Sequence, residues 1–319
     1  MADPLTGSDW FELFNSGAQP VSLGGLFFTD DLTKQTLSPI PPLSFICAGG
    51  NGFVQFFADS QPGAGPDHVN FKLSKSGESI ALFSPDSTLI TAVTFDAQQT
   101  GVSEGRFPDG STNLVSFTTT VSPAHSDFLP LSNVVVNEVL THTDPPLEDA
   151  VEFYNPTAAA VDLSGWFVSN SQDDLKKHRI ADGTILPAHG FKVLYEYQFN
   201  LTNGSAIPFT FNSAHGDQAW LSQADASGNL TGYRAFATFG AAANGVSFGR
   251  YTNSIGEVDF VAISARTFGV DNPSTVEEFR TGAGAPNAYP LVGPVVINEL
   301  MYDPPSQDGI ADNIQDEYV

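Results

Sequence analysis

The sequence predicts an all-β protein built from antiparallel β-sandwiches in tandem, and three observations support this fold class. Apolar residues alternate with polar ones over short runs such as Phe11/Leu13 and Val151/Phe153, as half-buried strands require. The 26 Phe, 29 Gly and 22 Pro favour short strands joined by turns. No window of about 11 residues sustains the apolar spacing of an amphipathic helix. We therefore expect about eight to ten short strands in each sandwich.

Four sequence blocks occur twice in the same order, which predicts two copies of one domain. The paired blocks are 9–15 with 149–155, 21–27 with 161–167, 75–78 with 214–217, and 101–107 with 245–251. Turn residues such as Asn15-Ser16-Gly17 follow the expected strands. Gly77 and Gly216 occupy matching places where a turn requires a positive φ.

A third copy begins near the end of the sequence. Val134–Leu140 recurs as Val295–Met301, with the pair Asn-Glu at the same place in both. We expect residues 127–133 to connect the two copies and residues 274–294 to be an extended, mobile linker. The predicted organisation is 1–127, a sandwich lacking its first strand; 134–273, a complete sandwich; 274–294, a linker; and 295–319, the first strand of a truncated third copy.

Five motifs, the first of them taken from the repeat of residues 134–139, resemble the lamin tail domain, an immunoglobulin-like sandwich that also occurs in bacterial surface and secreted proteins. They are Val-Val-Ile-Asn-Glu-Leu at 295–300, Glu-Phe-Tyr-Asn-Pro-Thr at 152–157, Val-Asp-Leu-Ser-Gly-Trp at 161–166, the run at 179–190, and Gly-Val-Ser-Phe-Gly-Arg-Tyr at 245–251. The resemblance covers nearly all of 134–273 and most of 1–126. It implies tandem immunoglobulin-like β-sandwiches with a non-catalytic role.

Charge excludes several partners. The 12 Lys and Arg against 36 Asp and Glu give a net charge of −24, which repels nucleic acids and anionic membrane surfaces. No run of about 18 apolar residues is present, so no membrane insertion is expected. The N-terminus does not read as a signal peptide. We expect an extracellular or cell-surface location, with a signal upstream of this sequence.

The pattern Gly-x-Ser-x-Gly appears at 101–105 and again at 245–249. In an α/β-hydrolase this pattern carries the nucleophile on a strained turn that is followed by a helix. No helical pattern follows either occurrence, so Ser103 and Ser247 are expected to be structural. Glu12 and Glu152 also recur at matching places, which favours a structural role over acid–base chemistry. The chain is therefore predicted not to be an enzyme.

No catalytic, cofactor-binding or metal-binding residue is assigned, and calcium is the one ion kept as a candidate cofactor. The acidic run 308–317 has calcium-type oxygen ligands but does not fit an EF-hand loop. The six histidines lack zinc-binding spacings. Cys47, between apolar neighbours, is expected to be a buried structural thiol.

Trp10 is the candidate ligand-binding residue. Trp166 and Trp220 stand in predicted strands and are expected in the core. Trp10, by contrast, is replaced by Ala150 in the second copy, which favours a surface position.

The function expected from the sequence is a structural or interaction module, either a spacer or a protein-binding domain, of a large exported or cell-surface bacterial protein. The alternative is a carbohydrate- or surface-binding module, with calcium as an aid; accessory domains of a secreted hydrolase rank third. The expected partners are a protein or a cell-surface polysaccharide. Val295–Met301 is also expected to complement the first copy, within the chain or between chains.

Overall fold

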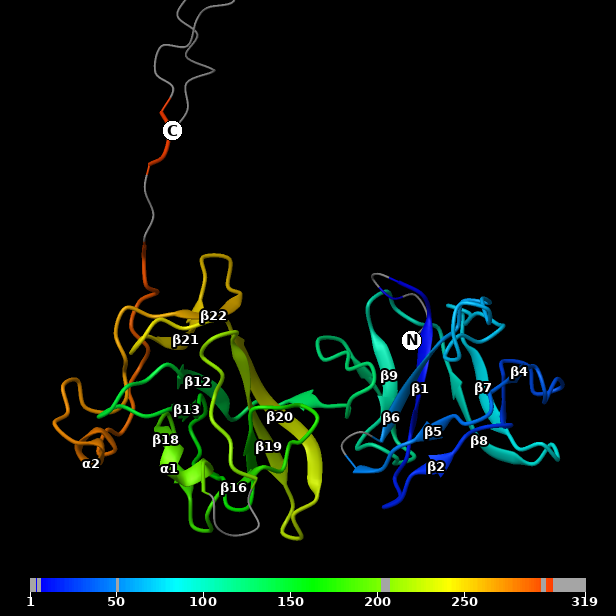
Figure 1. Ribbon diagram of the computed structural model, residues 1–319, viewed down its shortest axis with the longest axis horizontal. Helices are drawn as coiled ribbons and strands as arrows, with labels where there is room; N and C mark the ends of the chain where they lie inside the picture. Colours follow the sequence, from blue (N-terminus) through cyan, green and yellow to red (C-terminus); the bar gives the residue numbers. More distant parts are fainter. Residues whose placement is uncertain (1–3, 5–6, 50–51, 202–206, 294–296, 301–319) are drawn as a thin grey trace, which may run out of the picture.

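The computed structural model describes residue 4 and residues 7–49, 52–201, 207–293 and 297–300, and is nearly all β, as the sequence predicts (Figure 1). Two units lie side by side. The strands of the first unit are β1 (Trp10–Phe14), β2 (Val21–Ser22), β3 (Phe27–Thr29), β4 (Ser38–Pro39), β5 (Phe45–Ile46), β6 (Phe53–Phe57), β7 (Glu78–Phe83), β8 (Leu89–Phe95), β9 (Ser103–Arg106) and β10 (Leu114–Phe117). They form one four-stranded sheet, β4-β3-β7-β8, and the pairs β1-β6, β9-β10 and β2-β5.

The second unit contains two five-stranded sheets. Its elements are β11 (Leu129–Pro130), β12 (Val135–Leu140), β13 (Ala150–Tyr154), β14 (Val161–Asp162), β15 (Phe167–Ser169), β16 (His178–Arg179), β17 (Ile185–Leu186), β18 (Phe191–Tyr195), α1 (Glu196–Phe199), β19 (Asp217–Ala224), β20 (Leu230–Phe239), β21 (Ser247–Thr252), β22 (Val258–Ala262) and α2 (Val276–Phe279). The sheets are β18-β13-β12-β21-β22 and β11-β20-β19-β15-β16, and β14 pairs with β17.

Apolar side chains from the sheets of each unit form its core. In the second unit Val136, Val139 and Phe153 pack with Leu221 and Phe239. In the first unit Phe11, Phe28 and Phe56 are buried together, with ring centroids of Phe11 and Phe28 4.9 Å apart. The apolar residues at alternate positions, such as Val151 and Phe153, lie in this core, which explains the period-two pattern of the sequence.

Gly77 and Gly216 precede matching strands at φ values of +94° and +83°. A Cβ there would lie 2.6 Å and 2.2 Å from the carbonyl oxygens of Phe95 and Phe239. Glycine is required at both places because the backbone of the neighbouring strand passes too close for a side chain. The predicted positive φ is confirmed at both.

The expected mobile linker at 274–294 is not extended over its described length, residues 274–293. Helix α2 lies within it, and Phe279 is completely buried against Tyr195 and Phe268. The Arg280 guanidinium donates two hydrogen bonds of 2.7 Å to the Glu148 carboxylate. The Gly and Pro residues of this segment are typical of a linker. The buried ring of Phe279 nevertheless anchors the segment to the second sandwich.

Replacing Phe279 by Ala is expected to lower the free energy of unfolding of the second unit by about 3–5 kcal/mol, because the ring is fully buried. Chemical denaturation followed by tryptophan fluorescence measures this change. The exposed neighbour Glu277 provides a control, since Glu277→Ala should leave the unfolding midpoint nearly unchanged. Equal midpoints for Phe279→Ala and the wild type would mean that the segment is not part of the domain.

Cys47 is exposed, so the expectation of a buried thiol is wrong. Alternation at the end of β5 explains this placement, since Ile46 is buried at 3% exposure whereas Phe45 is 57% exposed. Two apolar neighbours in sequence therefore do not bury the residue that directly follows the strand. In the described part of the chain, no helix is both long and apolar enough to cross a membrane.

Candidate functional site

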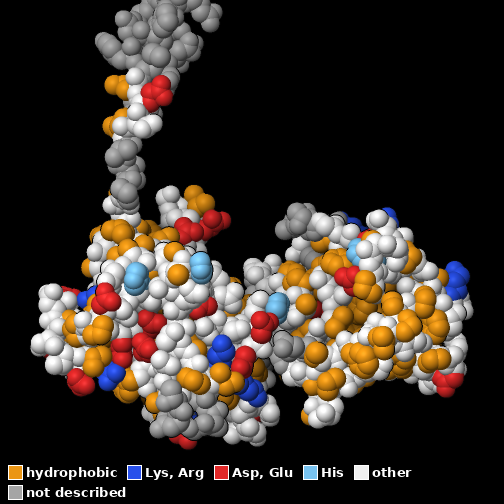
Figure 2. Space-filling model, viewed as in Figure 1, with side chains coloured by type: hydrophobic (Ala, Val, Ile, Leu, Met, Phe, Trp, Pro, Cys, Tyr) orange, Lys and Arg blue, Asp and Glu red, His pale blue; other side chains and the backbone are white. Residues whose placement is uncertain are grey.

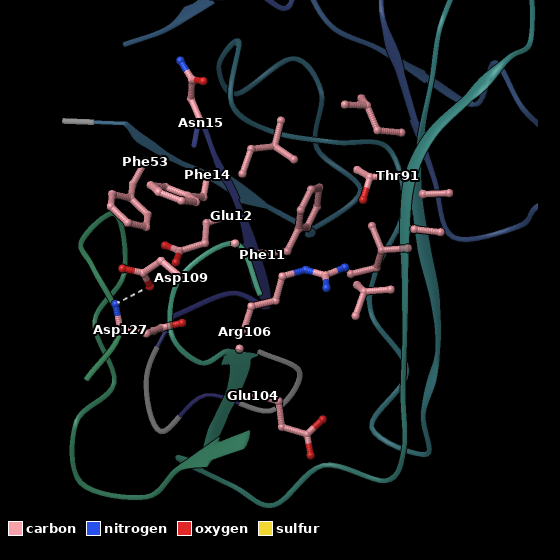
Figure 3. A pocket seen from close by; sticks show the side chains of 18 of the residues that line it. Phe11, Glu12, Phe14, Asn15, Phe53, Thr91, Glu104, Arg106, Asp109 and Asp127 are labelled. Atoms are coloured by element: carbon pink, nitrogen blue, oxygen red, sulfur yellow. Dashed lines mark hydrogen bonds between the residues drawn. The ribbon is translucent and has the colours of Figure 1, made fainter. Parts of the chain in front are cut away.

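A pocket of about 620 Å³ opens in the first unit between β1 and β9 (Figure 3). Residues of β1 and β9 form its two sides, and residues of β7 and β8 line it from the opposite sheet. The pocket therefore reaches into the space between the two sheets. Figure 2 also shows apolar side chains gathered over the first unit, where Phe45, Leu89 and Ile90 are each at least 50% exposed.

Trp10, the residue selected from the sequence, lies at the start of β1 and lines this pocket. It is half-buried, whereas its counterpart Ala150 is completely buried in the second unit. Trp166 and Trp220 are 5% and 4% exposed, so their predicted core positions are confirmed. A ligand-binding role for Trp10 stays a prediction.

Three carboxylates, Glu12, Asp109 and Asp127, lie on one side of the pocket (Figure 3). Burial, together with the charge of the neighbouring Asp127, raises the pKa of Glu12 to about 8. Burial also raises the pKa of Asp127 to about 6, and the pKa of Asp109 is raised for the same reason. These carboxylates repel one another when ionised. Of the three, Glu12 has a pKa above neutral pH and therefore keeps its proton there.

Hydrogen bonds from backbone amides and a side-chain hydroxyl partly offset the cost of burying these carboxylates. The Ala124 amide donates to Glu12 Oε2 at 2.9 Å, and the Asp127 amide donates to Asp109 Oδ1 at 3.0 Å. The Ser122 hydroxyl donates to Asp127 Oδ1 at 2.9 Å. The sequence analysis selected Glu12 but missed Asp109 and Asp127, because both stand in irregular segments without any motif.

The same place in the second unit is occupied by strand β12. It pairs antiparallel with β13 on one side and β21 on the other, and thereby joins them into one sheet (Figure 1). Glu138 and Asn137 of β12 are buried. Asn137 Nδ2 donates to Glu152 Oε1 at 2.6 Å, and Ser247 Oγ donates to Glu138 Oε1 at 2.5 Å.

These contacts give the serine of the Gly-x-Ser-x-Gly pattern in the second unit a structural role. Ser247 Oγ bonds a carboxylate that also accepts the Thr267 amide at 3.1 Å, within a sheet rather than on a strand-to-helix turn. Ser247 is a donor that satisfies a buried charge. Its counterpart Ser103 lines the pocket of the first unit.

Metal binding has no support in the described parts of the chain, where no group of three or more His, Cys, Asp or Glu side chains is placed to hold an ion. His68 Nδ1 lies 2.7 Å from Asp59 Oδ2, and His125 Nδ1 lies 3.2 Å from Asp173 Oδ1. The acidic run 308–317, weighed for calcium, falls outside the described residues.

Comparison with known proteins finds one similarity, and it lies within the second unit. Residues 130–236 match the family model described as Lamin Tail Domain. No curated protein and no solved structure gives a significant match. The matched range contains β12 through β19 and most of β20, and therefore includes the strand that carries Glu152. Residues 130–236 are thus similar to the lamin tail domain, a family with an immunoglobulin-like fold.

Proposed function

We propose that this chain is a structural and protein-interaction module of a large exported or cell-surface bacterial protein, in which tandem sandwiches are held at a fixed spacing. The lamin tail domain supports a non-catalytic role. One observation carries the proposal further: the segment between the two units is fixed by contacts to both.

Arg234 of β20 is the centre of this junction. It is 3% exposed, and its Nη1 donates to the Ser126 carbonyl at 2.9 Å. Its guanidinium lies 5.4 Å from the ring centroid of Phe128, within cation–π range. Burial lowers the pKa of Arg234 to about 10, whereas Asp109 and Asp127 of the first unit raise it. The side chain stays charged at neutral pH and attracts both carboxylates.

Backbone pairing and an aromatic contact complete the junction. Strand β11 pairs in parallel with β20, and the Leu131 amide donates to the Arg234 carbonyl at 2.8 Å. Phe107 of the first unit meets Tyr233 edge to face, with ring centroids 5.2 Å apart. A connection with ordered backbone pairing and a buried cation resists bending, as a spacer requires.

Replacing Arg234 by Gln is expected to loosen the junction, because two buried carboxylates lose their cation. Small-angle X-ray scattering should show an increased radius of gyration and a broader distribution of dimensions. Arg179, whose side chain is 52% exposed, provides the control, and Arg179→Gln should leave the scattering curve unchanged. Tyr233→Ala, at a position 39% exposed, tests the same junction at a site where the fold tolerates change. Scattering curves identical for all four proteins would contradict a junction held by these contacts.

A second candidate function is carbohydrate or surface binding, favoured by the convergence of Trp10 with Glu12 and Asp109 on one pocket. Co-sedimentation with insoluble polysaccharides and cell walls, with calcium and with chelator, tests it. Retention that is lost in Trp10→Ala would support sugar binding in the pocket. Equal retention of both proteins would reject this site.

A further inference from the structure

The pocket lies between two described strands, β1 and β9, that are not paired with each other, so a further β-strand could pair with both; we call this space the slot. In the second unit, β12 pairs with both β13 and β21, the counterparts of β1 and β9. Within the described residues, β1 pairs only with β6 and β9 only with β10. One sheet of the second unit thus corresponds to two separate pairs in the first. The edges of β1 and β9 that face the pocket are templates for a further strand.

A buried hydroxyl in the slot lacks the partner that its counterpart has. Ser103 is 3% exposed and lines the pocket, and its Oγ has no hydrogen-bond partner among the described residues. In the second unit Ser247 Oγ donates to the Glu138 carboxylate of β12. A strand that carries a glutamate at the position of Glu138 would satisfy Ser103 in the same way.

In the second unit, the side-chain amide of an asparagine in β12 donates hydrogen bonds to two acceptors. The carboxylates of Glu12 and Asp127 offer acceptors at the corresponding place in the first unit. Asn137 Nδ2 donates to Glu152 Oε1 at 2.6 Å and to Asn287 Oδ1 at 2.9 Å. Asp127 matches Asn287 by contact, since each lies beside the equivalent glycine of the β9 or β21 strand, Gly105 or Gly249. An asparagine entering the slot would therefore donate to Glu12 and Asp127, which relieves the repulsion between these two buried carboxylates.

The opposite wall of the slot also matches. Ala235, Ala237 and Phe239 of β20 are each at most 8% exposed, and they pack with Val136 and Val139 of β12. Their counterparts by strand register are Thr91, Val93 and Phe95 of β8, which line the pocket and are more exposed. Two apolar side chains, spaced as Val136 and Val139 are, would cover this wall.

We propose that the slot binds Val295–Met301 of a second copy of this chain as a β-strand. This segment repeats the β12 sequence, with Asn298 and Glu299 in place of Asn137 and Glu138. The register of β12 places Glu299 opposite Glu12 and Gly105, and Leu300 opposite Phe11 and Glu104. Ile297 and Leu300 would then face β8.

The C-terminal segment is placed to reach another molecule rather than its own first unit. Its described residues, 297–300, lie outside any strand, with Ile297 and Leu300 exposed by 78% and 63%. The within-chain form of the expected pairing is therefore not found. The Leu291 amide is bound to the Ala262 carbonyl, so residues 292–294 add only about 10 Å of reach. Figure 1 shows the chain leaving the second unit on the side away from the first.

Sedimentation of residues 1–319 from micromolar to millimolar concentration tests this proposal. We expect concentration-dependent association that disappears when the chain ends at Leu291. Ser103→Ala and Glu299→Ala should each weaken association on the order of ten-fold, because each removes one end of a charge-assisted hydrogen bond. Combining the two should cost little more than either alone. Ser222 is a matched control, since its Oγ is also buried with no hydrogen-bond partner in the part of the chain that the structure describes, and Ser222→Ala should leave association unchanged.

The proposal names the partner of the interaction module proposed above, and it can fail while the rigid spacer stands. A chain that remains monomeric at all concentrations would overturn it. Association that is unaffected by Ser103→Ala or by the truncation at Leu291 would also overturn it, since another surface would then be responsible. Hydrogen exchange supplies a further readout. Protection of β1 and β9 in a monomer would place the strand within its own chain and reject the second copy.

Discussion

The Glu152→Gln variant is expected to be more stable than the wild type above neutral pH, by on the order of 2–4 kcal/mol near pH 9. Glu152 is completely buried and stands directly opposite Glu138 across the strand pair. Burial is the main cause that raises the pKa of Glu152 to about 8; within that net value the Asn137 hydrogen bond lowers the pKa and the Glu138 charge raises it. Gln keeps the acceptor for Asn137 without ever carrying charge.

The direction of the pH dependence follows from proton binding. The unfolded carboxyl releases its proton near pH 4.5, whereas the folded one keeps it until about pH 8. Between these values the folded state holds more protons, so wild-type stability falls as pH rises, by up to about 1.4 kcal/mol per pH unit. Denaturation midpoints measured from pH 4 to pH 9 test this. Wild type and variant should converge at the acidic end, and Glu257→Gln in an exposed turn should follow the wild type. Parallel curves for Glu152→Gln and the wild type would contradict the assignment.

The Glu138→Ala variant is expected to destabilise the second unit by about 3–5 kcal/mol. Glu138 is completely buried, and its carboxylate accepts hydrogen bonds from Ser247 Oγ and from the amide and hydroxyl of Thr267. Removing it leaves these donors without a partner and opens a cavity between β12 and β21. Urea denaturation at constant pH measures the loss.

Glu138→Gln provides the matched comparison. The amide oxygen retains one acceptor, so this variant should lose less stability than Glu138→Ala. Ser247→Ala should cost about 1–3 kcal/mol, because one donor to the carboxylate disappears. If Glu138→Ala unfolds at the same urea concentration as the wild type, the Asn-Glu motif does not stabilise the sheet, and the comparison with Ser103 loses its basis.

The repeat made much of this architecture predictable. Matching blocks at 9–15 and 149–155 became β1 and β13, and both carry a buried aromatic or aliphatic residue beside a glutamate. The core positions of Trp166 and Trp220 followed from their place in the expected sandwich strands. The family match at 130–236 agrees with the motifs in that range.

Other features depend on tertiary contacts that no local pattern encodes. Phe279 anchors a segment rich in Gly and Pro, because a pocket beside Tyr195 and Phe268 exists only in the folded domain. Asp109 and Asp127 meet Glu12 through loops whose paths the sequence does not specify. Cys47 faces solvent because of one step in strand alternation. The middle position of β12 between β13 and β21 is likewise a property of the sheet order.

The proposed fixed spacing of the two sandwiches is tested most directly by a distance distribution between spin labels. Exposed Cys47 labels the first unit, and a cysteine introduced as Ser227→Cys in the exposed β19–β20 turn labels the second. Double electron–electron resonance should give one narrow distribution, which broadens when Tyr233 is replaced by Ala. A broad distribution in the unaltered junction, unchanged by Tyr233→Ala, would show that the two units move independently and would contradict a rigid spacer.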